Sequence, residues 1–273
     1  MHGGAGLNRR AALRFLLVAL CLATPLWATP AVAAEAQELT VFAAASLREV
    51  FQALALTFEK QHPNVKVGFN FAGSQDLRVQ IAHGAKVDVF ASADWKNMKL
   101  LANQGMVLSP AVFARNLPVV VVPKNNPAKV ANFSDLPRVT HLVLGASETP
   151  IGAYTDAILA AAEKLHGKSF GEKVRASVRS RELNVRQVLT KVALGEADAG
   201  IVYKTDALTM PDKVQVIEIP SEINLVAEYP IAILSAAPHS DLARAFVKLV
   251  LSKEGQKALA AAGFSKVEPK GAK

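Results

Sequence analysis

The sequence predicts an α/β fold with two lobes, each a mostly parallel sheet flanked by helices. Short β-rich runs alternate with helical patterns from residue 38 onward, which is typical of βαβ units. Of the 273 residues, 51% are hydrophobic and 20% charged, enough apolar material for a full core. About seven strands exceed the content of one typical domain, so we expect two lobes.

The first 34 residues predict a cleaved signal peptide. Three arginines precede an apolar run over residues 15–22, and small residues follow at positions 31–34. Pro25 interrupts the apolar stretch, which falls short of the ~20 residues needed to span a bilayer. We therefore expect export to the periplasm, with no membrane insertion of the mature chain.

The mature chain lacks cysteine chemistry and carries a modest positive charge. Cys21 is the only cysteine and lies inside the leader, so no disulfide or thiol nucleophile is expected afterwards. Loss of the leader removes three arginines and no acidic residue, which lowers the formal net charge from +8 to +5. No basic run is interleaved with aromatic residues, so nucleic-acid binding is not expected.

The strands and helices are expected in alternation along the chain. The predicted strands are residues 39–43, 65–71, 87–91, 117–122, 142–145, 200–202 and 229–234. The predicted helices are residues 47–60, 77–83, 95–104, 154–166, 185–194 and 242–262. Glycines 84, 105, 167, 195 and 263 follow helical patterns where a left-handed C-cap is required.

We expect the chain to pass from one lobe to the other along two strands. Prolines occur at or next to the ends of the apolar runs 117–122 and 229–234, where the residue composition of the chain changes. We therefore assign residues 35–117 and 226–273 to lobe 1, and residues 118–225 to lobe 2.

Two strand-to-helix turns in lobe 1 carry a serine beside small residues. The first turn leads into Ser46, and Ser46 with Glu49 reads as a capping box. The second leads through Gly73 into Ser74 at a helix start. Free amides and the helix dipole favour an anion at such turns in open α/β sheets. A third turn carries Asp94, which we expect to be an N-cap outside the site, because a carboxylate repels an anion.

Lobe 2 offers further donors. Pro150 suits a first helical position, so Ile151 and Gly152 are expected to present free backbone amides.

A second set of donors follows later in the chain. Asn184 is expected to cap a helix, so that Val185 or Arg186 offers an amide. Tyr203 ends a short strand and supplies a hydroxyl on a rigid ring, although packing of that ring is an equally simple reading.

These residues resemble the periplasmic molybdate-binding proteins of ABC transporters. The resemblance extends over the mature chain and rests on residues 41–47, 71–74, 80–81, 84–85, 88–94, 150, 152, 154, 185–186 and 200–203. It implies a periplasmic binding protein fold of type II that closes around desolvated molybdate or tungstate. By this resemblance the ligand is held by Ser46, Ser74, Ile151, Val185 and Tyr203, through hydroxyls and main-chain amides.

The resemblance also implies a monomer that is not an enzyme, needs no cofactor and passes its ligand to the membrane permease of an ABC importer. Size would exclude the smaller sulfate, and a donor-only site would reject a protonated phosphate. Many relatives carry alanine where this chain has Ile151, and Asp76 adds a carboxylate near Ser74.

Three alternatives remain open at the level of sequence. The same fold could bind another oxyanion, such as sulfate or phosphate. A secreted serine hydrolase is disfavoured because no Gly-x-Ser-x-Gly motif occurs. A metal site built from the histidines is disfavoured because their spacing forms no local ligand pair.

Overall fold

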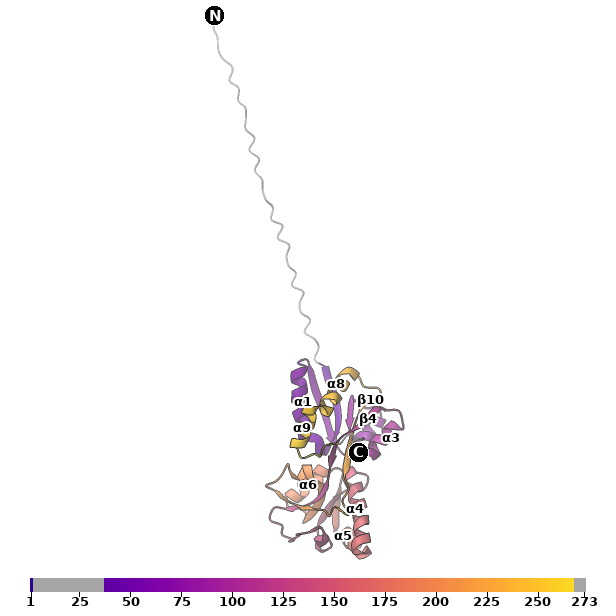
Figure 1. Ribbon diagram of the computed structural model, residues 1–273, viewed down its shortest axis with the longest axis vertical. Coiled ribbons are helices and arrows are strands. Elements are labelled where there is room, and N and C mark those ends of the chain that lie inside the picture. The colour runs from indigo at the N-terminus through magenta and orange to yellow at the C-terminus, as the bar shows by residue number, and fades with distance from the viewer. Residues whose placement is uncertain (2–36, 268–273) are drawn as a thin grey trace, which may run out of the picture. The chain divides into compact units, whose positions relative to one another are not determined.

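The computed structural model describes Met1 and residues 37–267 (Figure 1). The predicted signal peptide, residues 1–34, thus lies outside the described residues apart from Met1. The two sheets and their flanking helices confirm the expected α/β fold.

The first sheet has five strands in the order β2-β1-β3-β10-β4. Its strands are β1 (Gln37–Ala44), β2 (Val65–Ala72), β3 (Val89–Ala91), β4 (Val107–Asn116) and β10 (Ala227–Leu234). The accompanying helices are η1 (Ala45–Leu47), α1 (Arg48–Gln61), α2 (Ser74–Ala82), α3 (Trp95–Ala102), α8 (Ser240–Leu251) and α9 (Lys253–Ala261).

The second sheet also has five strands, in the order β7-β6-β8-β5-β9. Its strands are β5 (Pro118–Pro123), β6 (Leu142–Gly145), β7 (Val178–Glu182), β8 (Ala199–Tyr203) and β9 (Val214–Glu218). The accompanying helices are η2 (Phe133–Arg138), α4 (Pro150–His166), α5 (Lys168–Ala176), α6 (Val185–Ala193) and α7 (Lys204–Ala207).

Both sheets are mixed rather than mostly parallel. β1 pairs in parallel with β2 and β3, whereas β10 runs antiparallel to β3 and β4. In the second sheet β6 is parallel to β7 and β8, whereas β5 is antiparallel to β8 and β9. The antiparallel strands β5 and β10 are those that enter each sheet from the other one.

The chain passes between the sheets twice. β4 leads through Leu117 directly into β5, and residues 219–226 connect β9 to β10. The strands of the first sheet therefore come from residues 37–116 and 227–234, and those of the second from residues 118–218. The division into lobes at residues 117 and 225 remains a prediction.

The long helix predicted over residues 242–262 is two helices. Ser252 ends α8 and caps α9, because its hydroxyl accepts a hydrogen bond from Gly255 N–H at 3.2 Å. Among the residues that the structure describes, none of the helices is long and apolar enough to cross a bilayer.

The helix ends agree with the glycine pattern. All five glycines expected at C-caps have positive φ, between 68° and 90°. Each of these turns therefore uses a conformation that other residues rarely adopt.

The core under the first sheet is built from aromatic side chains. Phe51 and Phe58, two turns apart on α1, pack edge-on against Phe246 of α8 at 5.9 and 5.5 Å between ring centroids. All three are buried. This packing holds α1 against α8, and Phe51 also contacts the sheet through Phe69 of β2 and Phe113 of β4, at 6.4 and 5.7 Å between ring centroids.

Candidate functional site

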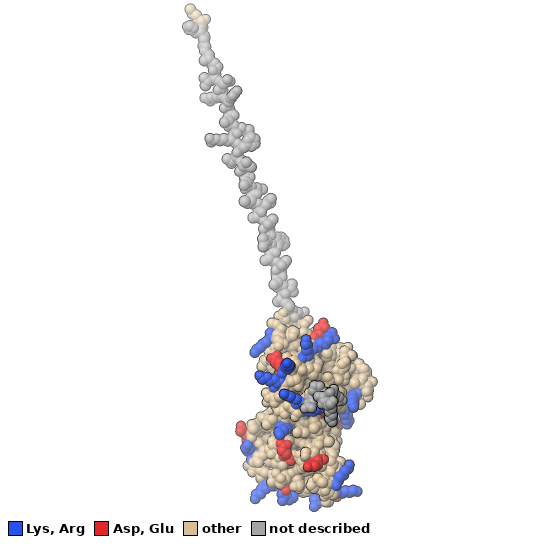
Figure 2. All heavy atoms as spheres, viewed as in Figure 1, with Lys and Arg blue, Asp and Glu red and all other residues tan. Residues whose placement is uncertain are grey.

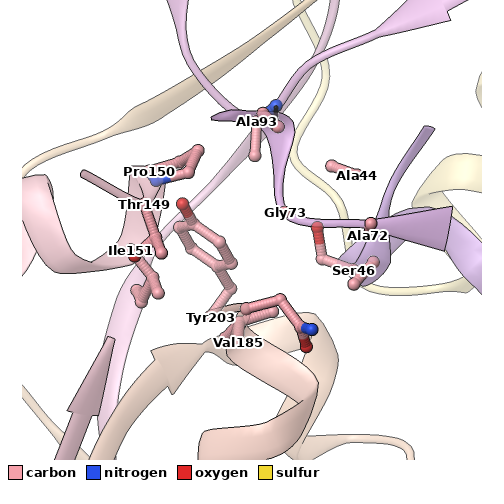
Figure 3. A pocket seen from close by; sticks show the side chains of 13 residues that line it. Ala44, Ser46, Ala72, Gly73, Ala93, Thr149, Pro150, Ile151, Val185 and Tyr203 are labelled. Carbon is pink, nitrogen blue, oxygen red and sulfur yellow. Dashed lines mark hydrogen bonds between the residues drawn. The ribbon is translucent and has the colours of Figure 1, made fainter. Parts of the chain in front are cut away.

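A small cavity lies where strands of both sheets end. Its volume is about 20 Å³, enough for about one water-sized group. All five residues of the predicted site line it. The lining residues are Ala44, Ala45, Ser46, Ala72, Gly73, Ser74, Ala93, Thr149, Pro150, Ile151, Asn184, Val185 and Tyr203 (Figure 3).

The lining residues lie at or just after the carboxyl ends of six strands. Those from the first sheet lie at the ends of β1, β2 and β3, and those from the second lie at the ends of β6, β7 and β8. Ligands of open α/β sheets bind at this edge, where helix N-termini point inward. The alanines and Gly73 add little side-chain bulk, so that a ligand can approach the backbone.

Ser46 lies in η1, and the expected capping box is not formed. No side chain caps η1 or α1. The Ser46 hydroxyl instead pairs with Tyr229 Oη at 3.0 Å, and Glu49 forms an ion pair with Arg186. The capping motif fails because both side chains have partners outside their own helix.

Ser74 is the first residue of α2 rather than its cap. Gly73 occupies the N-cap position with an extended backbone and no side chain. The Ser74 hydroxyl accepts a hydrogen bond from Ala93 N–H at 3.0 Å. Since a backbone N–H can only donate, the hydrogen of the Ser74 hydroxyl remains available for another acceptor.

Of the two backbone amides predicted to be free at the start of α4, the Ile151 amide has no acceptor in the helix and the Gly152 amide is hydrogen-bonded. Thr149 caps the helix and accepts from Gly152 N–H at 3.0 Å, so the expectation of a free Gly152 amide was wrong. Ile151 N–H belongs to the first turn and has no acceptor in its own helix. Its side chain packs over Gly145, where an added Cβ would lie 2.6 Å from Ile151 Cγ2. Gly145 therefore gives space to the larger side chain.

At the start of α6, too, one of the two candidate amides is hydrogen-bonded to the capping side chain and the other is not. Asn184 is the predicted cap, and its side chain accepts from Arg186 N–H at 3.0 Å and Gln187 N–H at 3.2 Å. The Arg186 amide is therefore not available. Val185, the first residue of the helix, lines the cavity with a first-turn amide.

Tyr203 brings a buried hydroxyl without a protein partner to the cavity. The residue is 1% exposed, and Tyr203 Oη forms no hydrogen bond with the described part of the chain. Burial raises the pKa of Tyr203 well above its ordinary value, so the phenol stays protonated. Its ring packs edge-on against Tyr154 and Tyr229, which holds the hydroxyl in place. A buried polar group of this kind needs an acceptor.

Among the described residues, none of those that line the cavity has a charged side chain. Asp94 caps α3 as predicted and accepts from Asn97 N–H at 2.9 Å. Asp76 lies outside the lining, where Gln75 Nε2 donates to its carboxylate at 3.1 Å. Burial raises the pKa of Asp76, with Glu148 contributing repulsion, whereas the hydrogen bond from Gln75 opposes the rise. On the face shown in Figure 2, lysines and arginines are scattered among acidic residues.

No group of histidine, cysteine, aspartate or glutamate residues that could hold a metal ion occurs within the described ranges. The arrangement offers hydrogen-bond donors of three kinds, from serine, tyrosine and backbone amides. Such a set can hold a small acceptor-rich solute.

Sequence reasoning missed Ala93 and Tyr229, which orient the two serines. Ala93 follows a strand end, and that position could have marked it. Tyr229 lies within β10, far along the chain, and no local pattern connects it with Ser46.

The chain is similar in sequence and fold to known binding proteins. The molybdate-binding protein ModA of Mycobacterium tuberculosis (strain H37Rv) is 38% identical over 233 residues, 85% of each chain. The substrate-binding domain of a putative molybdenum ABC transporter from Clostridium difficile matches with a TM-score of 0.64 and 31% identity, covering 85% of this chain and 99% of that one.

A third relative shows the fold alone. The sulfate-binding protein SubI from Mycobacterium tuberculosis H37Rv has a TM-score of 0.74 at 20% identity, covering 85% of this chain and 88% of that one. The family model described as bacterial extracellular solute-binding protein matches residues 39–265, nearly all of the described chain. The chain therefore belongs to the bacterial extracellular solute-binding proteins.

Proposed function

We propose that this chain captures molybdate or tungstate in the cavity, in the periplasm, and delivers it to the membrane permease of an ABC importer. The ligand would be held by Ser46, Ser74, Ile151, Val185 and Tyr203. The protein would act as a monomer, without a cofactor and without catalysis.

The buried hydroxyl of Tyr203 is the observation that carries the proposal. It has no hydrogen-bond partner among the described residues, and Ser74 and the first-turn amides of Ile151 and Val185 lie on the same cavity. The Thr149 hydroxyl donates to Ala146 O at 2.6 Å and accepts from Gly152, so it is already satisfied. A ligand that only accepts hydrogen bonds fits such a cavity, whereas a protonated anion would leave a donor facing a donor.

The choice of molybdate rests on the relatives. The two relatives described above that are more than 30% identical to this chain have names that refer to molybdate or molybdenum. Sulfate is also fully deprotonated at neutral pH, so hydrogen-bond pattern alone does not separate it from molybdate. The size of the enclosed space would make that distinction.

Calorimetry with molybdate, tungstate, sulfate and phosphate tests the proposal. We expect one tight site for molybdate and tungstate, and much weaker binding of sulfate and phosphate. Heat with sulfate and none with molybdate would contradict the assignment. Import of molybdate in cells that carry or lack the gene tests delivery to the transporter.

A further inference from the structure

We propose that Tyr229, oriented by Asn116, is a positioning residue that commits the Ser46 hydroxyl to donate into the cavity. The inference rests on the proposed oxyanion-binding function and concerns how the site selects an unprotonated ligand. Neither Tyr229 nor Asn116 lines the cavity. Both would act through Ser46.

Tyr229 lies behind the cavity wall. It is part of β10, is fully buried, and places its hydroxyl 3.0 Å from Ser46 Oγ. Either oxygen of this pair could donate to the other. The direction of the bond determines whether the hydrogen of Ser46 is left for a ligand.

The side chain of Asn116 determines the direction of the hydrogen bond between Tyr229 and Ser46. It is the last residue of β4, and its Oδ1 accepts from Leu117 N–H at 3.0 Å. Since a backbone N–H can only donate, this bond fixes which end of the amide is Oδ1. The Nδ2 group is therefore turned toward Thr205 Oγ1 at 2.7 Å and Tyr229 Oη at 3.5 Å.

The hydrogen atoms can then be assigned along the chain of contacts. Asn116 Nδ2 has two hydrogens and no lone pair to offer, so Tyr229 Oη accepts from it. Tyr229 must give its own hydrogen to Ser46 Oγ, because the opposite direction would leave that buried hydrogen without an acceptor. Ser46 accepts from Tyr229, and its hydrogen points to the cavity.

This arrangement has a consequence for selectivity. A freely rotating serine could turn its lone pairs to a protonated anion and accept a hydrogen bond from it. A serine whose oxygen already accepts from Tyr229 favours an anion that offers only acceptors. Ser74 has the same constraint, because Ala93 N–H donates to its oxygen.

The hydroxyl of Tyr229 can be removed without removing its packing. The ring packs edge-on against Phe113, Tyr203 and Phe264 at 6.4, 5.6 and 5.5 Å between centroids. Tyr229→Phe retains these contacts and deletes one oxygen atom. Tyr154→Phe is the matched control, since Tyr154 also packs edge-on against Tyr203 and makes no hydrogen bond to Ser46.

A double-mutant cycle on ligand affinity tests the proposal. Affinities for molybdate and sulfate are measured by calorimetry for the wild type, and the cycle uses the anion that binds more tightly. It combines Tyr229→Phe with Ser46→Ala, and Tyr154→Phe with Ser46→Ala. We expect Tyr229→Phe alone to weaken binding about 5-fold, the effect of one hydrogen bond, and to have almost no further effect once Ser46 is alanine.

The outcomes separate this proposal from the proposed function. Equal penalties for Tyr229→Phe in the wild-type and Ser46→Ala backgrounds would mean that Tyr229 acts independently of Ser46, which contradicts the inference. Tyr154→Phe should give the same change in both backgrounds. Absence of molybdate binding by the wild type, with sulfate bound, contradicts the molybdate assignment alone; absence of both contradicts both proposals.

As a second readout, Tyr229→Phe should reduce the preference for molybdate over hydrogen phosphate, because Ser46 is then free to accept. An unchanged preference would contradict the selectivity part of the inference.

Discussion

The hydroxyl groups at the cavity differ in the hydrogen-bond partners of their oxygen atoms. Ser74 accepts from a backbone amide, Ser46 is paired with Tyr229, and Tyr203 has no partner among the described residues. Residue type alone does not distinguish them. Their surroundings leave a hydrogen of each available to a ligand.

Tyr203→Phe should lower molybdate affinity with little effect on folding. The free protein loses only an unpartnered buried hydroxyl, whereas the complex loses a hydrogen bond to an anion, worth about 1.5–3 kcal/mol. Calorimetry and thermal unfolding of the ligand-free protein measure the two effects. A variant that binds as tightly as the wild type would remove Tyr203 from the site.

Because the carboxyl of Asp206 is buried, we expect the free energy of unfolding to depend on pH. Burial raises the pKa of Asp206 from 3.8 to about 7. Arg186 opposes the rise, because its Nε lies 2.6 Å from Asp206 Oδ1. The folded state then holds more protons than the unfolded state between these values. Its contribution to stability is therefore present at low pH and is lost as the pH rises from about 4 through about 7.

Asp206→Asn should remove this contribution. The free energy of unfolding of the variant, relative to the wild type, should increase with pH across that interval. Urea unfolding at several pH values provides the measurement, with Asp212→Asn in an exposed turn as the control. A difference between variant and wild type that does not change with pH would refute the assignment.

The donor residues could be predicted from sequence because each lies at a turn from a strand into a helix and because these turns resemble those of a known family. Their hydrogen-bonding roles could not. Whether Gly152 or Ile151 keeps a free amide depends on the bond to Thr149, and whether Ser46 caps a helix depends on Tyr229. Contacts between distant residues decide these details.

At the scale of elements, the turn between β2 and α2 lies against the loop between β7 and α6. Gln75 Nε2 donates to Leu183 O at 2.8 Å, and a Cβ added to Gly73 would lie 2.4 Å from the same oxygen. This contact joins elements of the two sheets beside the cavity. Only glycine permits the approach.

Gly73→Ala should therefore weaken ligand binding by preventing the two turns from meeting. Gly68→Ala in the preceding strand β2 is the control, because its added Cβ would meet only the flexible side chain of Glu38. We expect a loss of at least tenfold in molybdate affinity for Gly73→Ala, roughly the cost of one strained backbone contact, and little change for the control. Equal affinities in both variants would show that this contact does not limit binding.

The strands that sequence reasoning missed all lie at sheet edges. β4, β7 and β9 are outermost in their sheets. Edge strands carry charged residues, prolines and bulges, which obscure the alternation of buried and exposed residues. β7 has the sequence VRSRE, and β4 contains Pro110 and register shifts against β10. The central strands are buried, and their apolar runs were predicted correctly.

At the scale of the molecule, Arg186 connects elements on the two sheets. Its guanidinium pairs with Glu49 of α1, beside the first sheet, and with Asp206 of α7, beside the second. Glu49 is half exposed, so its contribution is screened by salt. The pair adds an electrostatic contact between the parts that enclose the ligand.

Glu49→Gln should weaken molybdate binding about 2- to 5-fold at low ionic strength, as expected for an exposed ion pair. The difference from the wild type should shrink as salt is added. Glu59→Gln is a suitable control, because Glu59 pairs with Lys66 within the first sheet's own elements. Identical salt dependence of the wild type and Glu49→Gln would argue against this role.

The most direct measurement of the central claim is a crystal structure of the protein with molybdate, with anomalous scattering used to locate molybdenum. We predict a single peak in the cavity, with ligand oxygens within hydrogen-bond distance of Ser46, Ser74, Tyr203 and the amides of Ile151 and Val185. A peak elsewhere in the protein, or an anion held by charged side chains, would contradict the account.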